Sequence, residues 1–220
     1  MFPIAPRYTS TIAFLLTFTF QISCGQSSIN QQGDSKLDQK VEKFLADHRN
    51  DWRDMNVPPK DGQTLHDIIV SKKYTSALEI GTSTGHSTVW LAWAMSKTGG
   101  KVITVEIDER RYKEALDNLE EAGLSDYVDA RLADAHELVK ELSGPFDFVF
   151  IDADKNWYMQ YFKDVDPQLS VNGCITAHNV TNRFEGTKEF LDYIQSLPNY
   201  ITEIDRKSRS GISISYKKQD

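Results

Sequence analysis

A glycine-containing turn that follows a short apolar run is the first feature of the sequence with a chemical use. The run ends at Ile80, and Gly81-Thr82-Ser83-Thr84-Gly85 follows it. Glycines at such a turn allow positive φ angles and a close approach of the backbone to a ligand, and Ser87 is placed to cap a following helix. The turn has neither the Gly-x-Gly-x-x-Gly spacing of dinucleotide folds nor the lysine of a P-loop. It therefore predicts a site for an adenosine cofactor without a pyrophosphate.

Two acidic residues further along the chain fit the same cofactor. Glu106 stands where a second strand is expected to end, and a carboxylate there can accept hydrogen bonds from both ribose hydroxyls. The alternative for Glu106 is an exposed acid at a strand end. Asp134 follows a third expected strand, where it either binds the adenine amino group or caps the next helix.

A second group of reactive side chains follows two later apolar runs. Asp152 and Lys155 come after the run that begins at Phe146, and His178 and Asn179 follow the run at residues 173–177. Polar residues that directly follow successive parallel strands are expected at the same edge of a sheet, where ligands bind. These residues therefore predict that the ligand site extends beyond the cofactor turn.

Apolar runs alternate with helical patterns along the chain, and this alternation must position the residues named above. Strands are expected at residues 77–80, 101–106, 128–132, 146–152, 173–178, 200–205 and 211–217. Helices are expected at residues 37–48, from about 61, and at 87–96, 109–122, 136–141, 158–164 and 186–196. The pattern predicts an α/β fold with a doubly wound, seven-stranded sheet, mostly parallel, with an antiparallel hairpin at one edge and helices on both faces. Ligands bind beyond the carboxyl ends of the strands in such a sheet, which is where the reactive residues are expected.

Composition limits the classes of partner. The 220 residues are enough for one domain with a short extension, and a net charge of −7 argues against a general nucleic-acid surface. The two cysteines, Cys24 and Cys174, exclude a disulfide framework and a cysteine-based zinc site. Cys174 is expected to be a buried free thiol in a strand.

The beginning of the chain has the pattern of an export signal. Arg7 precedes an apolar stretch at residues 12–20, and Ile22-Ser23-Cys24 resembles the end of a bacterial lipoprotein signal. We expect residues 1–24 to be a signal peptide with Cys24 lipidated, and residues 25–36, which are rich in Ser, Gln and Asn, to be a flexible tether. Residues 37–220 would then form a domain anchored by lipid on the periplasmic side of the envelope. A signal that does not function would leave it in the cytoplasm.

Several of these segments resemble a known family. Residues 77–87 and 104–108 resemble motifs I and II of class I methyltransferases, and Phe146–Lys155 resembles the signature of the catechol and caffeoyl-CoA O-methyltransferases. Residues 55–63 resemble the segment that precedes motif I in that family, and the similarity runs from about residue 52 to residue 217. The resemblance implies a Rossmann-like fold and S-adenosylmethionine as the cofactor. The residues implied to bind the cofactor are Met55, Glu79, Gly81, Thr82, Ser83, Gly85, Ser87, Glu106, Ile107, Asp134, Ala135 and Asp152.

The resemblance also implies the chemistry at the acceptor. In the family, an Asp at the position of Asp152 and an Asp-Asn pair after the fifth strand bind a divalent cation, while a Lys at the position of Lys155 deprotonates the acceptor hydroxyl. This sequence has His178 where the family has the second Asp, and Asn179 follows it. Three alternatives stay open. Asp152, His178 and Asn179 bind a transition metal such as manganese; Asp152 and Asn179 bind magnesium weakly; or metal dependence is lost, and His178 acts as the base or positions the substrate.

The resulting hypothesis is O-methyl transfer to a small hydroxylated, catechol-like acceptor, with Lys155 and His178 as the catalytic residues. Trp52, Trp157 and Tyr158 are candidates to line the acceptor pocket. The alternatives are methylation of tRNA, which the acidic balance and the export pattern disfavour, and binding of S-adenosylmethionine without transfer. No nucleic acid and no membrane contact other than the lipid on Cys24 are expected, and the N-terminal helix could mediate a homodimer.

Overall fold

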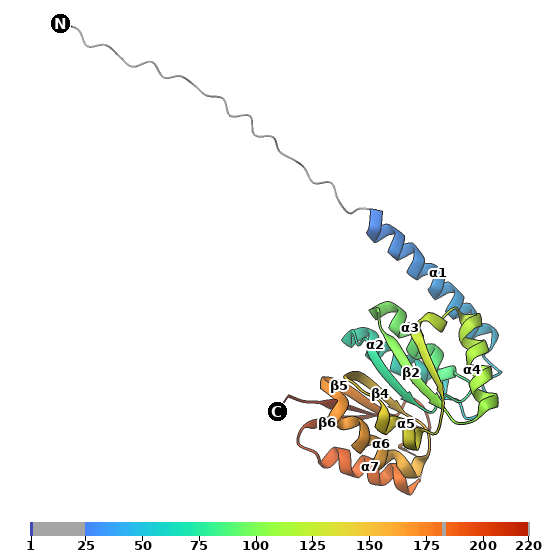
Figure 1. The fold of residues 1–220 in the computed structure, drawn as a ribbon, viewed down its shortest axis with the longest axis vertical. Coiled ribbons are helices and arrows are strands. Elements are labelled where there is room, and N and C mark those ends of the chain that lie inside the picture. Colours follow the sequence, from blue (N-terminus) through green and yellow to red (C-terminus); the bar gives the residue numbers. More distant parts are fainter. Residues whose placement is uncertain (2–24, 182–183, 220) are drawn as a thin grey trace.

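The structure is a computed structural model that describes Met1 and residues 25–181 and 184–219, with the backbone alone for residues 25–34. Its centre is a seven-stranded sheet in the order β3-β2-β1-β4-β5-β7-β6 (Figure 1). Strands β1 to β5 pair in parallel, while β7 pairs antiparallel with both β5 and β6. The predicted doubly wound sheet with its antiparallel edge hairpin is confirmed.

The strands are β1 (Ser76–Ile80), β2 (Lys101–Glu106), β3 (Val128–Leu132), β4 (Phe146–Ile151), β5 (Leu169–His178), β6 (Tyr200–Asp205) and β7 (Ile212–Lys217). The α-helices are α1 (Gly25–Asp47), α2 (Pro59–Lys72), α3 (His86–Thr98), α4 (Glu109–Ala122), α5 (Ala135–Glu141), α6 (Tyr158–Val165) and α7 (Glu185–Ser196). Short 3-10 helices are η1 (Ser125–Tyr127), η2 (Lys155–Trp157) and η3 (Asp166–Gln168). Strand β5 begins at Leu169 rather than at the expected Gly173.

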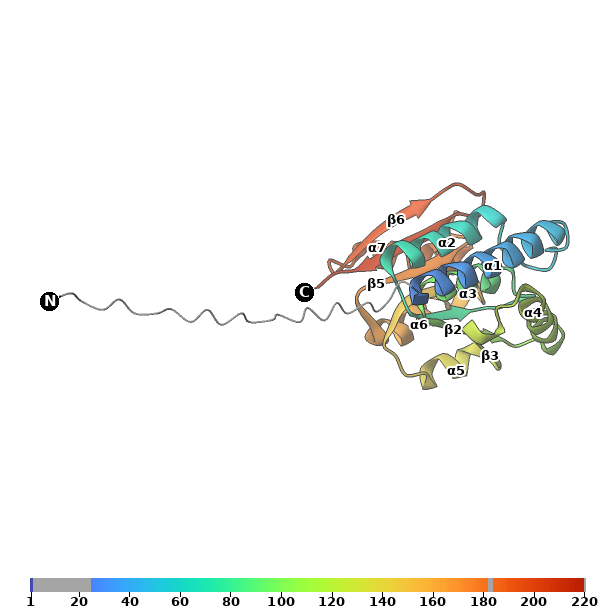
Figure 2. The same cartoon turned by 90° about the horizontal axis from the view of Figure 1, so that it is seen from above.

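The sheet separates two apolar cores because neighbouring residues of a strand point to opposite faces. In β4, Phe148 and Phe150 pack with residues of α1, α2 and α3 on one face. Val149 and Ile151 pack on the other face, with residues of α5, α6 and α7. The helices accordingly form two layers around the sheet (Figures 1 and 2). Cys174 lies in the first of these cores as a buried free thiol, as expected.

The local structure differs from the expectation at two places. Helix α1 begins at Gly25 and so includes residues 25–36, for which a tether was expected. Serine, glutamine and asparagine supply no apolar pattern, yet they carry only a small helix penalty, so a helix can extend through them. Ser87 does not cap α3, because Gly85 is the N-cap residue and Ser87 lies inside the helix.

Most of the predicted signal peptide, residues 2–24 with Cys24, lies outside the described residues. Within the part of the chain that the structure describes, no helix combines the length and apolar character needed to cross a membrane.

Candidate active site

A cavity of about 730 Å³ opens at the carboxyl ends of the parallel strands. This volume lies within the usual range for cofactor and small-molecule sites. The predicted site residues that line the cavity are Met55, Gly81, Thr82, Ser83, Ser87, Glu106, Ile107, Asp134, Ala135, Asp152, Lys155, His178 and Asn179. Among the residues predicted to bind the cofactor or a metal ion or to act in catalysis, Glu79 and Gly85 are the two that do not line it.

Gly81 brings the turn after β1 against the end of β4. Its φ angle is +104°, and a Cβ atom there would lie 2.9 Å from the backbone oxygen of Asp152. The amide of Asp152 also donates to the carbonyl of Ile80 at 2.9 Å. A side chain at position 81 would therefore both strain the backbone and push apart the two strand ends that form the floor of the cavity.

Gly81→Ala is expected to abolish measurable cofactor binding and to lower the stability of the fold. The positive φ angle alone costs about 1–3 kcal/mol for a residue with a Cβ atom, and the contact with Asp152 adds to it. Gly99→Ala is the matched control, because Gly99 also has a positive φ angle, +76°, but a Cβ atom there would meet no neighbouring atom within 4 Å. Calorimetry with S-adenosylhomocysteine and thermal unfolding would check both variants. Equal cofactor affinity in the two variants would contradict this role of Gly81.

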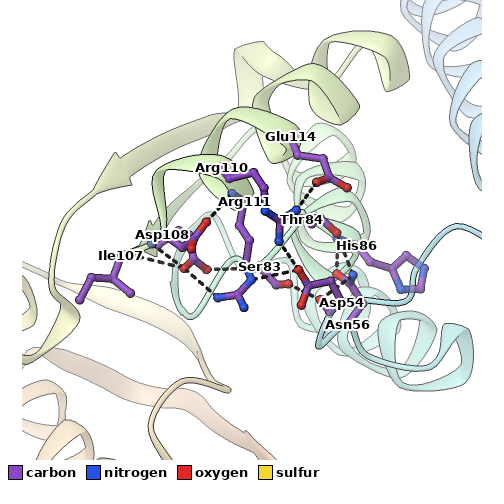
Figure 3. Close-up of polar contacts among 11 residues, drawn as sticks. Asp54, Asn56, Ser83, Thr84, His86, Ile107, Asp108, Arg110, Arg111 and Glu114 are labelled. Carbon is purple, nitrogen blue, oxygen red and sulfur yellow. Dashed lines mark hydrogen bonds and ion pairs between the residues drawn. The ribbon is translucent and has the colours of Figure 1, made fainter.

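Glu106 is a buried carboxylate at the end of β2, with only 7% of its surface exposed, which rules out the exposed-acid alternative. It accepts hydrogen bonds from the backbone amides of Ser83 at 2.7 Å, Ile107 at 3.1 Å and Asp108 at 2.9 Å. Figure 3 shows the three donor residues, Ser83, Ile107 and Asp108, near the glycine turn and the start of α4. A carboxylate has about four acceptor positions, so roughly one remains for a ligand hydroxyl rather than the two that the sequence suggested.

Residues 54–56, which precede α2, are hydrogen-bonded to the glycine turn. The backbone oxygen of Asp54 accepts from Ser83 Oγ at 2.5 Å, and Asn56 Nδ2 donates to Thr84 Oγ1 at 2.8 Å. Asp54 Oδ2 also accepts from Arg111 Nε at 3.2 Å (Figure 3). These contacts hold Met55 at the rim of the cavity with a φ angle of 53° and 67% of its surface exposed. Residues 54–56 therefore enclose the cavity from one side.

Glu79 and Gly85 support the turn from behind. Glu79 Oε2 accepts from Thr88 Oγ1 at 2.5 Å and from Thr104 Oγ1 at 2.6 Å. Complete burial raises the pKa of Glu79 to about 7, in spite of hydrogen bonds from neighbouring hydroxyls. Gly85 lets α3 and α4 pack closely, since a Cβ atom there would lie 3.2 Å from Ala115 Cβ. Both residues shape the cofactor turn without reaching the cavity.

Two acidic residues cap helices, and for Asp134 this confirms the capping alternative. Asp134 accepts from the backbone amide of His136 at 2.9 Å and is the N-cap of α5, while it also lines the cavity. One Asp134 carboxylate can therefore serve both of the roles expected for it. Asp154 caps η2 by accepting from the amide of Asn156 at 3.0 Å.

The acceptor side of the cavity is built on Asp152. Lys155 Nζ lies 2.6 Å from Asp152 Oδ1, and His178 Nδ1 lies 3.0 Å from Asp152 Oδ2. The hydroxyl of Tyr158 donates to Asp152 Oδ1 at 3.4 Å. Burial opposes the charged form of Asp152, but the contacts with His178 and Lys155 outweigh it and lower its pKa.

The other ring nitrogen of His178 contacts a residue that the sequence did not suggest. His178 Nε2 lies 2.9 Å from Oδ2 of Asp61, which also accepts from Ser208 Oγ at 2.7 Å. Asp61 lies in the first turn of α2 and is 2% exposed. Burial disfavours the charged imidazole, yet the hydrogen bonds to Asp152 and Asp61 raise the pKa of His178 to about 9.

A divalent cation does not fit this arrangement. A histidine binds a metal ion through an unprotonated nitrogen, whereas both nitrogens of His178 face carboxylates. Asp152 also divides its two oxygens between His178 and Lys155. Among residues 25–181 and 184–219, no group of three or more His, Cys, Asp or Glu side chains is arranged to hold a metal ion.

The aromatic residues expected in the acceptor pocket lie elsewhere. Trp52 stacks on His86 at a ring distance of 4.5 Å and packs on the core beside α1. Trp157 stacks on His136 at 3.9 Å, and Tyr158 is fully buried. Tyr161 and Phe184 line the cavity instead. Aromatic side chains near a site pack into cores as readily as into pockets, and the sequence pattern does not distinguish the two.

Comparison with known proteins agrees with this geometry. A sequence model described as O-methyltransferase matches residues 27–189. A catechol O-methyltransferase of Niastella koreensis is 39% identical over 113 residues, which are 50% of this chain and 51% of the relative. Caffeoyl-CoA O-methyltransferase 1 of Eucalyptus globulus is 30% identical over 136 residues, 60% of this chain and 55% of the relative. The matched part thus spans about half the length of these curated relatives.

A solved structure extends the comparison to most of the fold. The O-methyltransferase of Bacillus cereus, solved in complex with SAH, is 27% identical with a TM-score of 0.71, and the match covers 87% of this chain and 97% of that one. The fold and the cavity at its strand ends define a class I methyltransferase architecture. The chain belongs to the O-methyltransferase family.

Proposed function

We propose that this chain transfers a methyl group from S-adenosylmethionine to a hydroxyl group of a small catechol-like acceptor. The observation that carries the proposal is one cavity that joins two groups of residues. The glycine turn and Glu106 form the first group, and Asp152, Lys155 and His178 form the second. The similarity to a catechol O-methyltransferase over half of the chain supports the class of acceptor.

The residues present fit the cofactor. Glu106 has an acceptor position left for a ribose hydroxyl, Asp134 lines the same cavity, and the turn at Gly81 leaves no room for a Cβ atom. When bound, S-adenosylmethionine supplies a methyl group on a positively charged sulfur. The protein must then hold an acceptor oxygen in line with that methyl group and remove the hydroxyl proton.

Lys155 is the residue placed to take that proton. It lines the cavity with 22% of its side chain exposed, and Asp152 fixes its Nζ atom. In its unprotonated form, Nζ can accept the proton of the acceptor hydroxyl as the oxygen forms its bond to carbon.

Incubation of the full chain with methyl-labelled S-adenosylmethionine and a panel of catechols should yield monomethylated products detectable by mass spectrometry. Phenols with a single hydroxyl serve as the comparison, and they should react more slowly if two vicinal oxygens are recognised. Calorimetry with S-adenosylhomocysteine provides an independent measurement. Cofactor binding without methylation of any acceptor would favour the alternative of a binding protein, and absence of cofactor binding would overturn the proposal.

A further inference from the structure

The contact between Asp61 and His178 joins two residues 117 positions apart in the chain. Both are nearly inaccessible to solvent, at 2% and 4% exposure. Asp61 comes from α2, His178 from the end of β5, and Ser208, which also binds Asp61, from the loop between β6 and β7. Three separate parts of the fold thus meet at this contact, and His178 lines the cavity.

The hydrogen-bond pattern defines the charge of that ring. An ionised carboxylate only accepts hydrogen bonds, and a carboxylate oxygen lies 2.9 Å from Nε2 and 3.0 Å from Nδ1. Both nitrogens must therefore donate, which makes His178 an imidazolium. The Ser208 hydroxyl donates to the same oxygen of Asp61, which fixes that carboxylate beside the ring.

This imidazolium carries the same net charge as the aspartate and metal ion that it replaces. In the pattern that the sequence resembles, an Asp at position 178 and a divalent cation together carry a net charge of +1. An imidazolium at position 178 carries the same charge without a metal ion. With Lys155 beside Asp152, the four side chains of Asp61, His178, Asp152 and Lys155 sum to zero, so no charge is left buried without compensation.

We propose that the side chains of Asp61, His178 and Asp152 form a buried clamp that takes the place of the divalent cation, so that methyl transfer proceeds without metal. Asp61 is the positioning residue of this clamp, because it holds the ring of His178 through Nε2. His178 then supplies a fixed positive charge next to Lys155, which favours the negative charge that develops on the acceptor oxygen. This inference rests on the proposed function for its link to catalysis, but its central claim concerns metal binding and can be measured separately.

His178→Asp tests the clamp, since it restores the side chain that a cation would need. Calorimetric titration with Mn²⁺, in the presence of S-adenosylhomocysteine, should show no binding to the wild-type protein and binding to His178→Asp. Mn²⁺ should raise the Tm of the variant and leave that of the wild type unchanged. His178→Asn is the matched control, because it removes the imidazole at the same position without supplying a carboxylate. It should gain no Mn²⁺ site if the effect depends on the carboxylate.

The second measurement is the rate of methyl transfer by the wild-type protein, with and without a chelator. Its rate should be unchanged in a chelator, whereas His178→Asp should be active only with added Mg²⁺ or Mn²⁺. Binding of Mn²⁺ by the wild type, or loss of its activity in the chelator, would overturn the inference even if His178→Asp failed to fold. Failure of the proposed function would look different, since no acceptor would be methylated under any condition while the metal titrations would still give their result.

Asp61→Asn tests whether Asp61 positions the ring of His178 for catalysis or only links α2 to the end of β5. The variant keeps the size of the side chain and its hydrogen bond but removes the charge, so kcat should fall about tenfold while the affinity for S-adenosylhomocysteine stays unchanged. In ¹⁵N spectra at neutral pH, both ring nitrogens of His178 should carry protons in the wild type, and this signature should be weakened in Asp61→Asn. An unchanged spectrum and an unchanged kcat would show that Asp61 only anchors α2.

Discussion

Replacement of Lys155 by methionine is expected to lower kcat roughly 10²–10⁴-fold, which is the usual contribution of a general base. Methionine keeps the length and the apolar stem of the side chain but cannot accept a proton. Lys155 Nζ is held by Asp152 Oδ1 at 2.6 Å and by the carbonyl of Ala153 at 3.0 Å, so the amine is fixed in the cavity wall. The affinity for S-adenosylhomocysteine should stay within a few-fold of the wild type, because the cofactor residues lie on other elements.

Two further variants test whether the loss of kcat comes from the missing proton acceptor at position 155. Lys163→Met removes an exposed lysine from α6 and should leave kcat unchanged. Lys155→Arg keeps the positive charge, but a guanidinium does not give up its proton in proteins, so it should be nearly as slow as Lys155→Met. A Lys155→Arg enzyme with the wild-type rate would show that charge, and not proton transfer, is the contribution of this residue.

Glu106→Gln is expected to weaken the binding of S-adenosylhomocysteine roughly 10–100-fold. A hydrogen bond to a charged group contributes about 1.5–3 kcal/mol, and three of the acceptor positions of Glu106 already serve the amides of Ser83, Ile107 and Asp108. The loss should therefore match one ligand hydrogen bond, with a further contribution from the amide group that now faces backbone N–H donors. Isothermal calorimetry gives the affinity directly.

An analogue without ribose hydroxyls distinguishes the direct contact from a disturbed turn. The wild type should bind this analogue about as weakly as Glu106→Gln binds the normal ligand, and Glu106→Gln should barely discriminate between the two. Glu109→Gln is the control, since Glu109 carries an exposed ion pair with Lys113 at the start of α4. Equal losses of affinity for both ligands in Glu106→Gln would mean that the carboxylate acts only through the turn.

The fold and one side of the site could be predicted because their signals are local. The glycine turn, Glu106 and Asp134 each follow an apolar run directly, and the carboxyl ends of parallel strands meet at one edge of a sheet. Sequence spacing alone is therefore enough to bring these residues together. The Asp154 cap is local in the same way, since it binds the amide two residues further along.

The contacts that define the other side of the site could not be predicted, because they depend on how distant elements pack. Asp61 has the sequence context of an ordinary acidic residue in a first helical turn, where it would be expected to face solvent. Only the packing of α2 against the sheet buries it beside His178. The same holds for Asp54, which reaches Arg111 over a separation of 57 residues. The histidine at position 178, where the family has aspartate, therefore lies between two carboxylates, Asp61 and Asp152, which the sequence did not bring together.

The placement of β7 has a consequence for the order in which the molecule is completed. Strand β7 lies between β5 and β6, although it is the last strand along the chain. During synthesis, the edge of β5 that ends at His178 has no partner until residues 212–217 have left the ribosome, and Ser208 reaches Asp61 only with that same hairpin. Earlier elements can collapse around β1 to β4 while the chain is still growing. The contacts that join the acceptor side to this hairpin are therefore the last to form.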